Sequence, residues 1–224
     1  MGFRKAFMAA GLTLIVAHAA LSDPLIYSLS EKGSQYRTDP ASEGQGDAVK
    51  VDRKGYMVTD YDGRGNYGEP FMIYVDQAAG TWTAEPLGNG AKAVNMTTQQ
   101  GLRVIITSSE TTLAGALDVS AKVKAAKSMT GYRSWNHEYA DGSEGAGNTK
   151  IQLTLDIKTT KACKATSAET ATAAAAARGE DGLTVPDSIK AALGLDGLKE
   201  AQYERPVDQA ASKLNLPMDE SRGF

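Results

Sequence analysis

The chain has 224 residues, 42% of them hydrophobic, and a formal net charge of −3 from 24 basic and 27 acidic side chains. This mild acidity argues against nucleic-acid binding, which draws its affinity from clustered lysine and arginine. Cys163 is the only cysteine. An intramolecular disulfide is therefore excluded, and we expect Cys163 to be a small buried residue.

The N-terminal segment 1–22 has the three parts of a secretory signal peptide. Arg4 and Lys5 form a basic start, an apolar run follows over residues 6–17, and Ala17-His18-Ala19 supplies a small-x-small cleavage site. The run is shorter than the roughly 20 apolar residues of a membrane span. We expect a protein that is secreted, extracellular or on the cell surface, or periplasmic in a Gram-negative cell, with no membrane span after cleavage. The alternative is an uncleaved anchor.

From residue 23 to about residue 160, short apolar segments between turn residues predict a mainly β domain. The strand candidates are residues 25–30, 48–52, 56–60, 71–76, 81–84, 92–96 and 102–107. Residues 117–125 and 151–157 alternate strictly between apolar and polar side chains, which predicts two half-buried strands that pair as a long-looped hairpin. Short strands at close spacing predict an antiparallel β-sandwich of the immunoglobulin-like or jelly-roll type, with a barrel as the alternative.

The composition changes near residue 160. Segment 161–182 is rich in alanine and predicts a helix or a low-complexity linker. Segment 183–224 reads as a short tail, helical or extended, with two helical patterns, whose inward residues would be Ile189 and Leu193 in the first and Val207 and Leu214 in the second. Helices this short are marginal alone, so they need a surface, either on their own domain or on another subunit.

Few residues in the chain suit catalysis. His137 is the only histidine left after cleavage, and no Gly-x-Ser-x-Gly motif accompanies it. We therefore expect a protein that is not an enzyme. A hydrolase that uses two carboxylates stays open as an alternative, because the facing of two acidic residues cannot be judged from sequence.

The loop 60–69 is the strongest local motif. Its carboxylates Asp60, Asp62 and Glu69 stand among glycines, as in loops that bind calcium. Arg64 occupies a ligand position of the helix-loop-helix calcium motif, however, so a turn between strands is the preferred interpretation. We expect no cofactor other than this possible calcium ion.

These features favour a secreted structural protein, a self-assembling subunit of a surface filament or layer whose partners are copies of itself or other surface subunits. A donated N-terminal strand with Leu25, Tyr27 and Leu29 would complete a neighbour's sheet. The tail residues of the two helical patterns would dock on a partner. In general architecture the chain is similar to secreted pilin-type subunits that polymerise by donated strands, although the tail after Lys158 departs from them. The alternative is an extracellular or periplasmic module that binds carbohydrate or calcium.

Overall fold

The computed structural model of the protein describes residues 24–39, 44–45, 48–62, 66–118, 120, 124–176 and 184–213. The predicted signal peptide and the tail residue Leu214 lie outside these residues. Strands make up 54% of the structure and helices 14%, which confirms the prediction of a mainly β protein.

All strands in the described residues belong to one sheet. Its order is β11-β5-β4-β3-β1-β10-β9-β8-β7-β6, with β2 attached to β1. Every pairing is antiparallel except that of β11 with β5. A sandwich of two sheets is therefore not confirmed. The strands are β1 (Leu25–Asp39), β2 (Gly44–Gln45), β3 (Val49–Thr59), β4 (Phe71–Asp76), β5 (Thr81–Pro86), β6 (Lys92–Thr98), β7 (Gly101–Thr107), β8 (Thr111–Ala116), β9 (Ser128–Glu138), β10 (Glu144–Leu155) and β11 (Lys199–Glu200).

The sheet curves over one of its faces, which we call the inner face. Strands β4 and β7 are six steps apart in the sheet order, which would separate them by about 29 Å if the sheet were flat. Met72 and Tyr74 of β4 nevertheless share one hydrophobic cluster with Val104 and Ile106 of β7. The two halves of the sheet therefore enclose a common inner core, to which β1 contributes Leu25, Tyr27 and Leu29.

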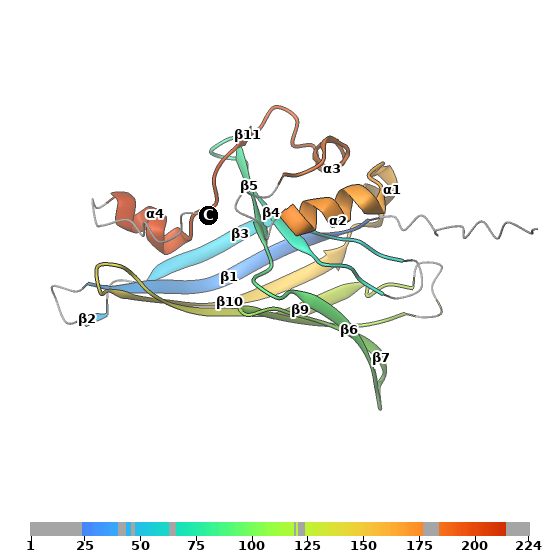
Figure 1. The fold of residues 1–224 in the computed structure, drawn as a ribbon, viewed down its shortest axis with the longest axis horizontal. Coiled ribbons are helices and arrows are strands. Elements are labelled where there is room, and N and C mark those ends of the chain that lie inside the picture. The colour runs from blue at the N-terminus through green and yellow to red at the C-terminus, as the bar shows by residue number, and fades with distance from the viewer. Residues whose placement is uncertain are drawn as a thin grey trace, which may run out of the picture.

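Three helices cover part of the opposite, outer face. They are α1 (Ile157–Ala162), α2 (Ser167–Ala176) and α3 (Asp187–Leu193), which lie together at one end of the sheet (Figure 1). The helix residues Ile189 and Leu193 are buried in one cluster with Ile26 of β1 and Phe71 of β4. The prediction that they face inward is confirmed, and the surface on which they pack belongs to their own chain.

The last helix lies at the other end of the sheet. Helix α4 (Pro206–Lys213) contacts the far parts of β1 and β3 (Figure 1). Its Val207 is buried, as predicted. Within the residues given above, no helix has both the length and the apolar character needed to cross a membrane.

One strand prediction is wrong. Strand β8 ends at Ala116, and the described residues after it form a turn with a single bridge between Leu117 and Ala126. The Asp118 carboxylate accepts hydrogen bonds from the backbone nitrogen and the hydroxyl of Ser120, which stabilises the turn in place of an extended backbone. Residues 119 and 121–123 lie outside the description.

The predicted hairpin is correspondingly different, because β10 pairs with β9 and β1 rather than with residues 117–125. Strand β10 contains most of the predicted strand 151–157, but it ends at Leu155. Asp156 then caps α1 by accepting a hydrogen bond from the backbone nitrogen of Thr159 at 2.9 Å.

Candidate functional site

The sheet forks between β3 and β4. The two strands pair only over residues 55–58 and 71–74. Gly55 marks the start of this pairing, where a Cβ atom would lie 1.9 Å from the carbonyl oxygen of Ile73, so a larger residue does not fit. Residues 49–54 remain paired with β1 on one side only. In the described parts of the chain, no strand pairs with their other edge.

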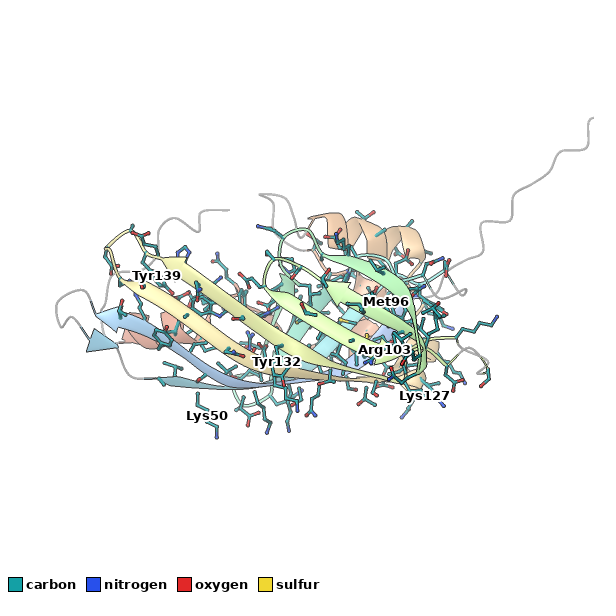
Figure 2. The ribbon with its side chains drawn as sticks, turned by 90° about the horizontal axis from the view of Figure 1, so that it is seen from below. Lys50, Met96, Arg103, Lys127, Tyr132 and Tyr139 are labelled. Carbon is teal, nitrogen blue, oxygen red and sulfur yellow. The ribbon has the colours of Figure 1, made fainter. Side chains whose placement is uncertain are left out.

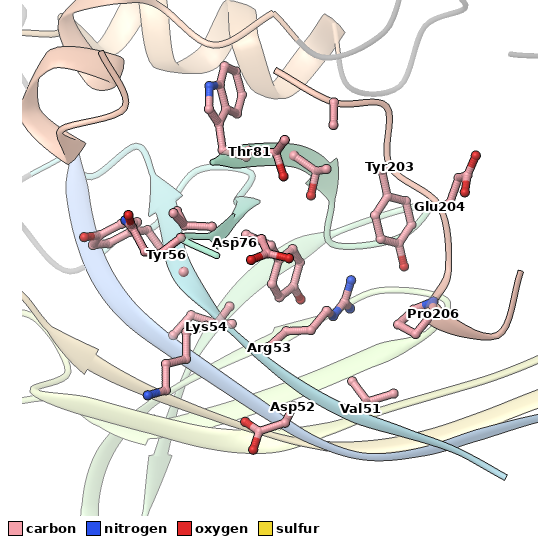
Figure 3. A pocket seen from close by; sticks show the side chains of 18 of the residues that line it. Val51, Asp52, Arg53, Lys54, Tyr56, Asp76, Thr81, Tyr203, Glu204 and Pro206 are labelled. Atoms are coloured by element: carbon pink, nitrogen blue, oxygen red, sulfur yellow. The ribbon is translucent and has the colours of Figure 1, made fainter. Parts of the chain in front are cut away.

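A cleft of about 970 Å³ lies beside this unpaired edge. It is bounded by β3, by β4 and β5, and by the segment 201–206 that leads into α4 (Figure 3). Arg53 and Tyr203 point toward one another across it, whereas Asp52 and Lys54 point to the other side of β3. The unpaired edge of β3 and the Arg53 side chain therefore both face the cleft.

Segment 201–206 is held by hydrogen bonds at both of its ends. The backbone nitrogen of Ala201 donates to the carbonyl oxygen of Trp82 at 2.9 Å, which extends the contact of β11 with β5. At the other end, the backbone nitrogen of Val207 donates to the side-chain oxygen of Gln35 at 3.2 Å. Tyr139 donates to the Asp208 carboxylate at 2.6 Å. These bonds hold the cleft's third wall on the same chain.

A buried network of four charges lies behind the cleft on the inner face. Arg53 donates to Glu31 at 2.7 Å, and Arg133 donates to Glu85 at 2.6 Å. The Arg53 guanidinium also lies 3.7 Å from the Glu85 carboxylate. Tyr74 donates to Glu31 at 2.6 Å, so this carboxylate receives both a cation and a neutral donor. Two positive and two negative groups balance, as burial of charge requires.

The network sets the protonation of its members. Burial alone would raise the pKa of Glu31, but Arg133 and Arg53, together with hydrogen bonds from Thr149 and Tyr74, hold that pKa below its ordinary value. Burial raises the pKa of Tyr74 well above its ordinary value, so its hydroxyl stays protonated as a donor. Glu31 is therefore ionised in the folded protein at neutral pH.

Arg53 connects this network to the cleft. Its side chain is 16% exposed, and its guanidinium carbon lies 3.8 Å from the centroid of the Tyr74 ring and 5.4 Å from that of Tyr203. Its Nε atom is buried and has no hydrogen-bond partner among the residues that the structure describes. Lys50 and Lys54 on the same strand are exposed.

The structure does not gather the predicted calcium residues into one group. Asp60 accepts from the backbone of Tyr61, and Asp62 accepts from the backbone of Asn66, so both carboxylates take part in the local turn. Across the described residues no three His, Cys, Asp or Glu side chains lie close enough together to hold a metal ion. Glu69 is half-buried beside this turn.

The other predicted residues lie in separate places. Leu25, Tyr27 and Leu29 belong to the central strand β1, which pairs with β3 and β10 of its own chain. Cys163 is buried in the core of the outer face, as predicted. His137 follows Arg133 and Trp135 on the inner face of β9, whereas Cys163 lies in the core of the outer face, so the structure does not bring the two together.

Sequence reasoning did not predict the charged network, although a signal is present. Glu31 continues the inner-face series that begins with Leu25, Tyr27 and Leu29. A charged residue in the apolar phase of a strand indicates a buried partner of opposite charge.

Together, the fold and the cleft define a mainly β protein with an open strand edge inside a polar cleft. No protein-family model matches this chain, and no curated protein matches it.

Proposed function

We propose that this protein is an exported, non-enzymatic structural subunit of a surface filament or layer, and that it binds a neighbouring subunit by strand addition in the cleft. The observation that carries the proposal is the unpaired edge of β3 over residues 49–54. An extended segment placed there gains main-chain hydrogen bonds along the edge, and side-chain contacts on alternate residues provide specificity.

Lys50 and Lys54 lie exposed beside the edge, and Asp76 and Glu204 also line the cleft. The two lysines next to the edge favour an acidic partner segment. A strand added to β3 has side chains alternately next to Arg53, inside the cleft, and next to Lys50 and Lys54 on the other side of the strand. Asp52 is already paired with Lys32 at 3.2 Å. A carboxylate opposite Arg53 would approach the exposed part of this cationic side chain. The proposed occupant is therefore an extended, acidic segment of a second subunit.

This arrangement changes the role expected for the N-terminal strand. β1 occupies the middle of its own sheet, with Tyr27 opposite Leu155 on one side and Met57 on the other. Donation of β1 to a neighbour would require both ladders to open. An edge that is already unpaired accepts a partner without that cost, so the proposal places the acceptor at β3.

Charge reversal at the edge tests the proposal. The double substitution Lys50→Glu/Lys54→Glu should weaken self-association by at least about tenfold, because an acidic partner would then meet like charges. Hydrogen–deuterium exchange measures the site directly. In the wild type, those amides of residues 49–54 that do not bond to β1 should become protected as the protein concentration rises, while the β1–β10 ladder is protected throughout.

The matched control is Lys158→Glu/Lys164→Glu, which makes the same charge change at exposed residues outside the cleft. It should assemble as the wild type does in negative-stain images. Exchange in residues 49–54 that stays fast at concentrations where assemblies are visible would contradict the proposed acceptor. An absence of any assembly, across all concentrations imaged, would contradict the proposed function.

A further inference from the structure

The strand β6 forms one end of the sheet, far from β3 in the strand order. β6 is the last strand in the sheet order and pairs only with β7 over Lys92–Thr98. Its far edge has no strand partner in the part of the chain that the structure describes. Edge strands of natural proteins are usually short, charged, bulged or covered, because an open edge pairs readily with another chain.

The sequence of β6 carries little of this protection, and the contact that Asn95 makes with the loop 60–69, a side-chain hydrogen bond to Asn66 at 3.4 Å, does not use the backbone edge. The strand has seven residues and no proline, and its one charged residue, Lys92, stands at its beginning. Val94 is 48% exposed and Met96 is 47% exposed, and they are two of the four exposed large apolar side chains among the described residues. Both lie on the outer face, opposite Ile105 and Arg103 of β7.

The inner-face residue Ala93 packs against the core, so the strand cannot rotate to hide Val94 and Met96. Figure 2 shows Met96 near Arg103 on the strands β6 and β7, with Tyr132 farther along the sheet. The buried residues of α2 and α3 pack with β1, β3, β4 and β5, and no β6 residue belongs to that cluster.

We propose that β6 binds β6 of a second copy of this chain, antiparallel, across a two-fold axis that passes through Asn95. The sequence of the strand is self-complementary in this register. Val94 of each copy lies opposite Met96 of the other, so four apolar side chains meet on the outer face. Lys92 lies opposite Thr98, and no lysine faces another lysine.

Neighbouring registers of the same facing are less favourable. Centring the pair on Val94 places Met96 opposite Lys92, and centring it on Met96 places Val94 opposite Thr98. The Asn95-centred pair also uses all seven residues of each strand. It joins two copies into one continuous sheet through an isologous contact, which is the commonest form of symmetric dimer.

This interface is independent of the proposed acceptor at β3, which lies elsewhere in the sheet order. A chain with both contacts has one surface that forms pairs and another that links pairs. Two such contacts are enough to extend an assembly beyond a dimer. Failure of the β3 proposal would leave the β6 dimer intact, and failure of the β6 proposal would leave strand addition at β3 intact.

Cysteine cross-linking tests the register. In a Cys163→Ala background, Asn95→Cys places the two thiols opposite one another at the axis, so mild oxidation should give a covalent dimer. The matched variant is Thr97→Cys, on the same strand and the same face. Its two copies would be separated by about 13 Å along the strand, beyond the Cα separation of a disulfide. Thr97→Cys should therefore stay monomeric on a non-reducing gel.

Sedimentation velocity tests the interface without cysteines. Met96→Lys should abolish the dimer, whereas Tyr132→Lys, an exposed change on the same outer face, should keep it. Melting temperatures of both variants establish that they fold. Equal cross-linking of Asn95→Cys and Thr97→Cys would overturn the register. A wild-type protein that sediments as a monomer at every concentration, with no cross-link at Asn95→Cys, would overturn the dimer.

Discussion

Replacing Glu31 by glutamine should lower the free energy of unfolding by about 3–5 kcal/mol, because it leaves Arg53 buried with less compensating negative charge. Glu31 is fully buried and accepts hydrogen bonds from Arg53 and Tyr74. Urea unfolding at neutral pH measures the change. The double variant Glu31→Gln/Arg53→Met should recover part of the loss, since it removes both charges of the pair.

The pH dependence gives a second readout of the same group. The folded-state pKa of Glu31 lies below its ordinary value of 4.5, so its contribution to stability is present above that value and is lost as the pH falls through the folded pKa. Wild-type stability should therefore fall more steeply in acid than that of Glu31→Gln.

Asp52→Asn is the control, because the Lys32–Asp52 pair is exposed and contributes about 1 kcal/mol at most. Equal losses for Glu31→Gln and Asp52→Asn would show that burial of the network has no special role.

Replacing Ile189 by alanine should cost about 2–5 kcal/mol, the usual range for a buried large-to-small change. Ile189 is fully buried, and it packs in a cluster with Ile26, Phe71 and Trp82 of the sheet. Because these partners belong to the same chain, the loss should be independent of protein concentration. Urea midpoints measured over a hundredfold range of concentration check this.

Ala191→Ser is the matched control, at an exposed position of the same helix, and should change stability by no more than about 0.5 kcal/mol. An Ile189→Ala variant as stable as the wild type would contradict packing of α3 on its own sheet. A midpoint that rises with concentration in the wild type only would instead indicate docking between subunits.

Much of the strand content follows from local pattern. β4 begins and ends at the predicted residues 71 and 76, and β7 begins one residue before the predicted strand 102–107. In another place the sequence predicted two strands where the structure has one. The predicted strands 48–52 and 56–60 are joined in one strand, β3 (Val49–Thr59), because the β1 ladder runs past Gly55 without a break. A glycine reads as a turn in sequence, whereas here it allows two strands to approach closely.

The curvature of the sheet could not be predicted in the same way. It depends on contacts between residues far apart in the chain, such as Arg133 with Glu85, 48 positions apart, and Thr149 with Glu31, 118 positions apart. Alternation predicts which face of a strand is buried, but it does not say which strand lies across from it. The cleft could not be predicted for the same reason. It exists only because β4 stops pairing with β3 after Tyr74.

The position of β1 affects how the protein acquires its structure. β1, the first strand along the chain, pairs over eleven residues with β10, whose last residue, Leu155, lies opposite Tyr27. A chain that emerges with its N-terminus first therefore cannot pair β1 with β10 until most of its residues have emerged. Contacts between such distant residues slow folding. If the chain is exported through a narrow channel, this topology delays formation of the central sheet until passage is nearly finished.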